Sequence, residues 1–106
     1  MRIAREILTY SGFSNITESK SVEPSFIVGE FDLVKLTIIY YQKENKFECD
    51  ITSVDPLFAT RYNDIPTMMF NKSGGIESYL YAVIRIAISQ NRMINRAKKQ
   101  KKYFRN

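Results

Sequence analysis

Histidine and tryptophan are absent from this sequence, and cysteine occurs only once, at Cys49. A single cysteine cannot form an internal disulfide. Without histidine, a cysteine or serine nucleophile lacks its usual base, and the sequence has neither a zinc-ligand spacing nor a P-loop. These absences exclude the commonest hydrolase, transferase and zinc sites. We therefore expect a protein that is not an enzyme and that uses no catalytic residue, metal or cofactor.

Long apolar runs are also absent. The longest run without a charged residue, residues 7–17, has 11 residues and is half polar, whereas a membrane-spanning helix needs about 20 apolar residues. Arg2, Arg5 and Glu6 interrupt the apolar segment that a secretory signal would require. We expect no contact with a membrane, and the lack of disulfides agrees with a reducing, cytoplasmic location.

Acidic residues are absent from the last 29 positions of the chain. Residues 1–77 hold 8 cations and 11 anions, a net charge of −3, whereas residues 78–106 hold 8 cations and no anion, a net charge of +8; the sum is the net charge of +5. A segment of one sign raises the local potential and attracts polyanions. Cations at the end of a helix also complement its dipole, but that effect accounts for two or three of them.

The hydrophobic pattern predicts a first helix over residues 2–10, which ends at Ser11-Gly12. Strands are predicted from alternation and β-propensity at 25–31, 33–42 and 47–54, with a hairpin connection at 43–46 and a bulge or turn at Gly29. Residues 14–23 are polar and fit either a loop or a weak strand. In the third predicted strand Phe47, Cys49 and Ile51 share one face, which makes Cys49 a buried thiol.

Residues 55–75 have no clear period, and Asp55-Pro56 favours one or two helical turns over residues 56–62. A structureless connection of this length is uncommon, so we expect hidden structure or a partner surface there. Met68, Met69 and Phe70 fit either core packing or a partner contact. The order α-β-β-β-(irregular)-α predicts a small two-layer α+β sandwich, with an antiparallel sheet and both helices on one face.

The last predicted helix begins near Gly75 and runs at least to Ala97. At 100° per residue, an apolar stripe lies on one side and a row of cations lies opposite, within roughly a 60° arc. The apolar stripe comprises Ile76, Leu80, Val83, Ala87 and Ile94, and the row of cations comprises Arg85, Arg92, Arg96 and Lys99. Lys98 and Lys101 fall where the apolar stripe would continue, so the last turns should leave the core. We predict a domain of residues 1–97 and a basic extension of residues 98–106.

This charge pattern leads to the hypothesis that the last helix contacts nucleic acid or another polyanion without strong sequence preference. The candidate phosphate-binding residues are Arg85, Arg92, Arg96, Lys98, Lys99, Lys101, Lys102 and Arg105, and the candidate base-stacking residues are Tyr103 and Phe104. The alternative is a protein that binds an acidic protein surface or assembles into an oligomer. The many Ile, Lys and Asn residues agree with an AT-rich genome, so a viral or mobile-element accessory factor or structural subunit fits this alternative.

Three weaker hypotheses rest on smaller groups of residues. Glu48 and Asp50 share a strand face and could hold the divalent cation of a nuclease. Lys35, Tyr41 and Lys43 could form a platform for a single strand on the sheet. The sequence "NKSGG" at residues 71–75 could bind an anion at the start of the last helix, although an ordinary helix cap at Ser73 or Gly74 explains it better.

Overall fold

The computed structural model describes residues 2–20, 23–54, 61–62, 68–69 and 75–103. Two helices and six strands lie within these ranges. In chain order they are α1 (Arg2–Tyr10), β1 (Ser14–Glu18), β2 (Ser25–Phe31), β3 (Val34–Tyr41), β4 (Lys46–Ser53), β5 (Arg61–Tyr62), β6 (Met68–Met69) and α2 (Gly75–Tyr103).

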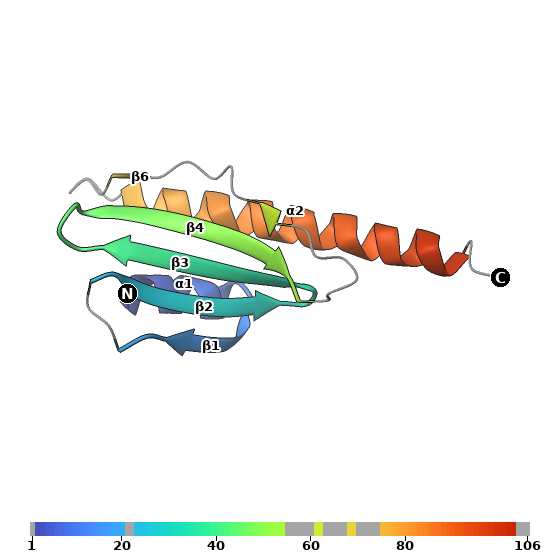
Figure 1. Ribbon diagram of the computed structural model, residues 1–106, viewed down its shortest axis with the longest axis horizontal. Helices are drawn as coiled ribbons and strands as arrows, with labels where there is room; N and C mark the ends of the chain where they lie inside the picture. The colour runs from blue at the N-terminus through green and yellow to red at the C-terminus, as the bar shows by residue number, and fades with distance from the viewer. Residues whose placement is uncertain (1, 21–22, 55–60, 63–67, 70–74, 104–106) are drawn as a thin grey trace.

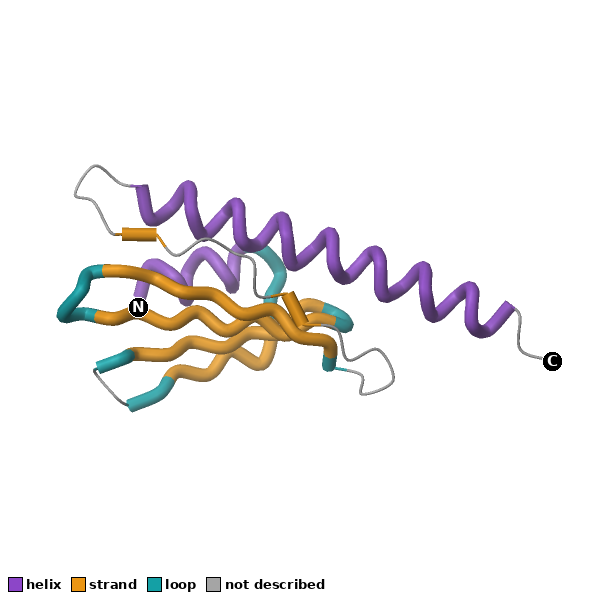
Figure 2. The backbone as a smooth tube through the Cα atoms, turned by 45° about the horizontal axis from the view of Figure 1, so that its top comes forward, coloured by secondary structure: helices purple, strands orange, loops and turns teal. Residues whose placement is uncertain are grey.

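The strands form one antiparallel sheet, and both helices lie on the same face of it (Figures 1 and 2). The strand order is β1-β2-β3-β4-β5. β5 and β6 pair with the same edge of β4, at opposite ends of that strand. α1 packs against β1 and β2, and α2 packs against α1 and the central strands. The predicted small α+β fold is therefore confirmed. The polar segment after the first helix also forms a strand, β1, beside the three strands that the sequence predicts.

α1 forms and ends as its sequence predicts. Ala4, Ile7 and Leu8 recur at helical spacing and are buried against the sheet. The backbone then turns at Gly12, whose φ of 92° lies in the left-handed region that glycine adopts without strain. The amide of Phe13 donates to the carbonyl of Leu8 at 3.0 Å, which closes the end of the helix.

The alternation of β3 and β4 places one side of each strand in the core. Leu36 and Ile38 are buried, and they pair in register with Ile51 and Cys49 of β4. This antiparallel pairing puts four apolar side chains on the face that the helices cover. The predicted inward positions, including that of Cys49, are confirmed.

The bulge or turn predicted at Gly29 is wrong. β2 and β3 pair continuously through Gly29, which lies opposite Leu36. A Cβ atom at Gly29 would meet side chains of Phe13, Ile16 and Leu8 at 3.4–3.5 Å, so the residue allows close packing beneath the α1–β1 connection. The register shift occurs instead in β1, between Ser14 and Thr17.

The helical turns predicted over residues 56–62 are wrong where the structure describes them. Arg61 and Tyr62 form β5, which pairs with Thr52 and Ile51 of β4. The edge of β4 offers backbone donors and acceptors, and this pairing outweighs a local helix signal. β6 pairs with the same edge, so the expected hidden structure is present; Phe70 and residues 55–60 lie outside the described residues.

α2 buries the apolar stripe that its sequence predicts. Ile76, Leu80, Val83, Ala87 and Ile94 are all buried. The helix continues to Tyr103, and its 29 residues span about 44 Å. Figure 1 shows α2 extending past the end of the sheet, and the longest dimension of the molecule is 54 Å. The division into residues 1–97 and 98–106 falls within this helix and stays a prediction.

Candidate functional site

Four cations form an exposed row on α2, which we call the α2 stripe: Arg85, Arg92, Arg96 and Lys99. They lie within roughly a 60° arc on the side of α2 opposite its buried residues, and they span about 21 Å along the helix axis. Among the described residues, the ion pairs are formed by cations outside the α2 stripe, and no described carboxylate pairs with Arg85, Arg92, Arg96 or Lys99.

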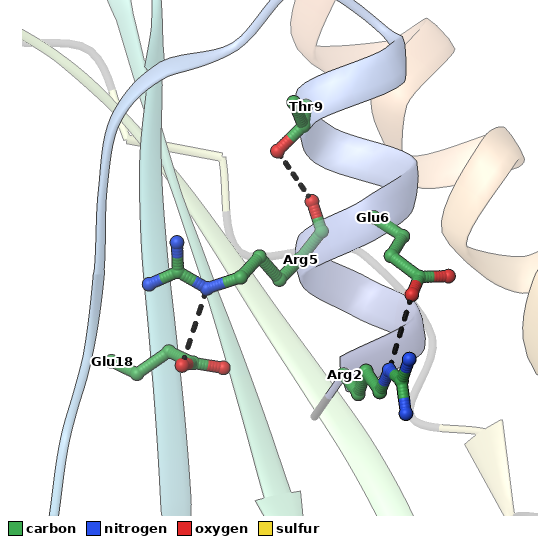
Figure 3. A network of polar contacts seen from close by, with 5 residues as sticks. All are labelled: Arg2, Arg5, Glu6, Thr9 and Glu18. Carbon is green, nitrogen blue, oxygen red and sulfur yellow. Dashed lines mark hydrogen bonds and ion pairs between the residues drawn. The ribbon is translucent and has the colours of Figure 1, made fainter.

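The exposed arginines of α1 differ from the α2 stripe in this respect (Figure 3). The Nε atom of Arg2 lies 3.3 Å from a carboxylate oxygen of Glu6, one turn along the helix. The Nε atom of Arg5 lies 3.2 Å from a carboxylate oxygen of Glu18 on β1. Exposed pairs of this kind contribute little stability, but they reduce the charge that α1 offers to a polyanion.

A cluster of polar side chains fixes α2 to the turn between β2 and β3. Asn91 is only 6% exposed, and its Oδ1 atom accepts a hydrogen bond from the backbone amide of Leu33 at 2.8 Å. The side-chain amides of Asn91 and Asn95 donate to the same carboxylate oxygen of Asp32, at 3.1 and 3.0 Å. The cluster therefore links the second half of α2 to this turn.

The same cluster perturbs Asp32 and involves Lys98. The hydrogen bonds from Asn95 and Asn91 hold the pKa of Asp32 below its ordinary value, and the charge of Lys98 lowers this pKa further. Asp32 has a φ of 51°, an uncommon backbone conformation that aspartate tolerates in turns. Lys98 is half-buried and interacts with its own chain, so its surroundings differ from those of the α2 stripe.

Tyr81 is an exposed aromatic residue at the start of the α2 stripe, and the sequence analysis did not identify it. It is 41% exposed and precedes Arg85 by one helical turn. At 100° per residue, Tyr81 shares the angular position of Lys99. This angular position, which follows from the sequence alone, was the signal that could have identified Tyr81.

The remaining candidate cations and aromatic residues lie at the end of the chain. The backbone of Lys101, Lys102 and Tyr103 belongs to α2, while their side chains lie outside the described residues. Phe104 and Arg105 lie outside the described residues entirely, as do residues 71–74 of the proposed anion site. Their roles stay predictions.

The outer face of the sheet engages its own charged residues near the β3–β4 hairpin. The Tyr41 hydroxyl donates to Glu48 at 3.1 Å, which raises the pKa of Tyr41. The Nζ atom of Lys46 lies 2.7 Å from Glu44, 3.8 Å from Glu48 and 4.9 Å from the centre of the Tyr41 ring. Glu48 and the ring of Tyr41 therefore already have partners in this chain.

The nuclease and platform hypotheses stay untested predictions. In the part of the chain that the structure describes, no three His, Cys, Asp or Glu residues come close enough to hold a metal ion. Lys35 is exposed on β3, and the backbone amide of Lys43 donates to a carboxylate oxygen of Glu23 at 2.9 Å.

Cys49 lies in the core. Burial raises the pKa of its thiol to about 12, and the nearby Tyr79 hydroxyl offsets part of this rise. The Tyr79 hydroxyl is also buried, and burial raises its pKa. A thiol in such surroundings stays protonated at neutral pH and is a poor nucleophile.

An apolar hollow of about 270 Å³ lies where the two helices begin. Its walls come from α1, α2 and the β3–β4 hairpin: Arg2, Ile3, Ala4, Tyr40, Phe47, Ile76 and Leu80. The Tyr40 hydroxyl donates to Asn45 at 2.8 Å, and the Arg2 side chain pairs with Glu6. The hollow therefore has few polar groups available for chemistry.

Comparison of the chain with protein families, curated proteins and solved structures finds no match. Among the described residues, no helix is both long and apolar enough to cross a membrane.

Proposed function

We propose that this protein is a non-enzymatic binding protein whose basic α2 face contacts nucleic acid without strong sequence preference. The contrast between two groups of exposed cations supports this proposal most. The arginines of α1 lie beside carboxylates of their own chain, whereas the α2 stripe has no carboxylate partner within the described residues. Such a row of cations raises the local positive potential and favours a polyanion.

The energy of this contact comes from the release of counterions. Each phosphate that a lysine or arginine neutralises adds about −0.9 to the slope of log K against log salt for duplex DNA, and about −0.7 for a single strand. The α2 stripe would meet about four phosphates. With Lys101 and Lys102 the number rises to about six, which corresponds to a slope near −5 on duplex DNA.

A pair of double variants tests the proposal. We expect Arg92→Gln with Arg96→Gln to weaken binding and to make the salt slope shallower by about two, because two phosphate contacts are lost. Arg2→Gln with Arg5→Gln is the matched control, since it removes the same charge from arginines that are already paired. The readout is fluorescence anisotropy of labelled 20-nucleotide DNA and RNA probes over a salt series.

Two results would overturn the proposal. The first is no binding of any probe at low salt. The second is an equal change of the salt slope in both double variants, which would mean that only the net charge matters.

The alternative partner is an acidic protein surface. Met93 is 58% exposed on α2, and an exposed apolar side chain close to cations is typical of a protein interface. Truncation after Ala97 separates the two proposals. A nucleic-acid-binding protein should keep its fold and lose affinity for the probes. An assembly protein should change its oligomeric size on gel filtration when no nucleic acid is present.

A further inference from the structure

The α2 stripe combines a single row of cations with an exposed aromatic ring at one end. Tyr81 lies about 6 Å along the helix axis from Arg85 and about 40° around it. Within the described residues, the Tyr81 hydroxyl has no hydrogen-bond partner in its own chain. Tyr81 is 41% exposed, so part of its side chain is open to a ligand that is bound along the α2 stripe.

α1 also carries an exposed aromatic residue, which the inference does not require. Tyr10, the last residue of α1, is 87% exposed. Arg5 contacts Glu18 on the β1 side of α1, and Tyr10 lies about 140° around the helix from Arg5. Tyr10 therefore lies on a different side of α1 from the Arg5–Glu18 contact.

An aromatic ring beside a row of cations distinguishes between two forms of nucleic acid. In a duplex the faces of the bases are covered by neighbouring bases, whereas a single strand can place a base against an aromatic side chain. The row of cations itself lies within a 60° arc and can follow one backbone. The exposed ring therefore favours a single strand.

We propose that the protein prefers single-stranded nucleic acid, with the backbone following the α2 stripe and one base stacking on Tyr81. This inference rests on the proposed function, and it adds the class of ligand and a residue that recognises the bases. Stacking on an aromatic residue tolerates any base, so the preference concerns strandedness and not sequence.

Three variants and three probes test the inference. The variants are Tyr81→Ala, Tyr81→Phe and Met93→Ala. The control at Met93 is an exposed α2 residue about 120° around the helix from Tyr81. The probes are a single strand, a duplex and an abasic single strand, each with the same number of phosphates per strand.

We expect Tyr81→Ala to weaken binding of the single strand by about 5- to 150-fold, the range for loss of one stacked base. Tyr81→Phe keeps the ring and should stay within about twofold of the original protein, as should Met93→Ala. The salt slope should not change in Tyr81→Ala, because no phosphate contact is lost. Its binding to the duplex and to the abasic strand should also match that of the original protein.

The inference and the proposed function fail in different ways. An equal loss on single strand and duplex, or no loss in Tyr81→Ala, would overturn the inference while leaving the salt-dependent binding intact. If no probe binds, or if the α1 and α2 double variants behave alike, the proposed function fails and the inference fails with it. Circular dichroism of each variant shows whether α2 is retained.

Discussion

Replacing Asn91 by alanine should destabilise the protein, because Asn91 is the one buried polar residue among those whose burial the structure describes. Its Oδ1 atom accepts the hydrogen bond from the amide of Leu33, which lies in the turn between β2 and β3. Leaving a buried amide without an acceptor costs about 1–3 kcal/mol, and alanine returns up to about 0.7 kcal/mol through its higher helix propensity. We therefore expect a net loss of about 1–2 kcal/mol.

Urea unfolding, followed by circular dichroism, measures this loss. In thermal unfolding, 1 kcal/mol corresponds to about 5 °C for a domain of this size, so the midpoint should fall by about 5–10 °C. Ser89→Ala is the control: Ser89 is exposed on α2, and a surface change of this kind stays within about 0.5 kcal/mol. Equal stabilities for the two variants would refute the role given to Asn91.

Asn91→Asp separates the hydrogen bond to Leu33 from the contact with Asp32. The new carboxylate can still accept from the amide of Leu33, but it replaces a donor that lies 3.1 Å from a carboxylate oxygen of Asp32. Two carboxylates this close raise the pKa of at least one of them, so the folded state favours the protonated form. This variant should be destabilised at pH 7 and should recover part of the loss as the pH falls towards 4. A loss that does not change with pH would contradict this geometry.

Two further predictions follow from the shifted pKa values. Because the pKa of Asp32 is lowered in the folded state, its carboxylate stabilises the fold at pH values above its ordinary pKa near 3.8. This contribution disappears as the pH falls through the lowered pKa. The difference in urea midpoint between the original protein and Asp32→Asn should therefore be larger at pH 7 than at pH 3, and a constant difference would contradict it. Cys49, with a pKa of about 12, should react with a thiol reagent at pH 8 only when urea opens the core. Rapid labelling of the native protein, read from absorbance, would refute this burial.

The elements that depend on local periodicity could be predicted from the sequence, and those that depend on distant partners could not. The apolar stripe of α2 and the alternation of β3 follow from the spacing of side chains along one element. β5 forms because an edge of β4 is available, and nothing in residues 61–62 alone indicates this. The same holds for Gly29, whose neighbours Leu8, Phe13 and Ile16 belong to segments that precede β2.

The same distinction between local patterns and distant contacts applies to the candidate site. The angular positions of Arg85 and Arg92 follow from the helical period, and both residues are exposed as expected. The contact of Asn91 with Leu33 joins residues 58 positions apart, so no short pattern encodes it. Asn91 lies among apolar residues of the buried stripe, and a polar residue in that position was the one available signal.

If α2 binds a single strand as proposed, its reach beyond the sheet also determines how many molecules fit on one strand. The α2 stripe covers about 21 Å along the helix axis. The whole molecule is 54 Å long, and Figure 1 shows α2 running along this dimension. A strand that follows α2 would then be covered over a length more than twice that of the α2 stripe. On a long strand, neighbouring molecules should then bind no closer together than this covered length. Stretches of backbone without a contact should therefore remain between them.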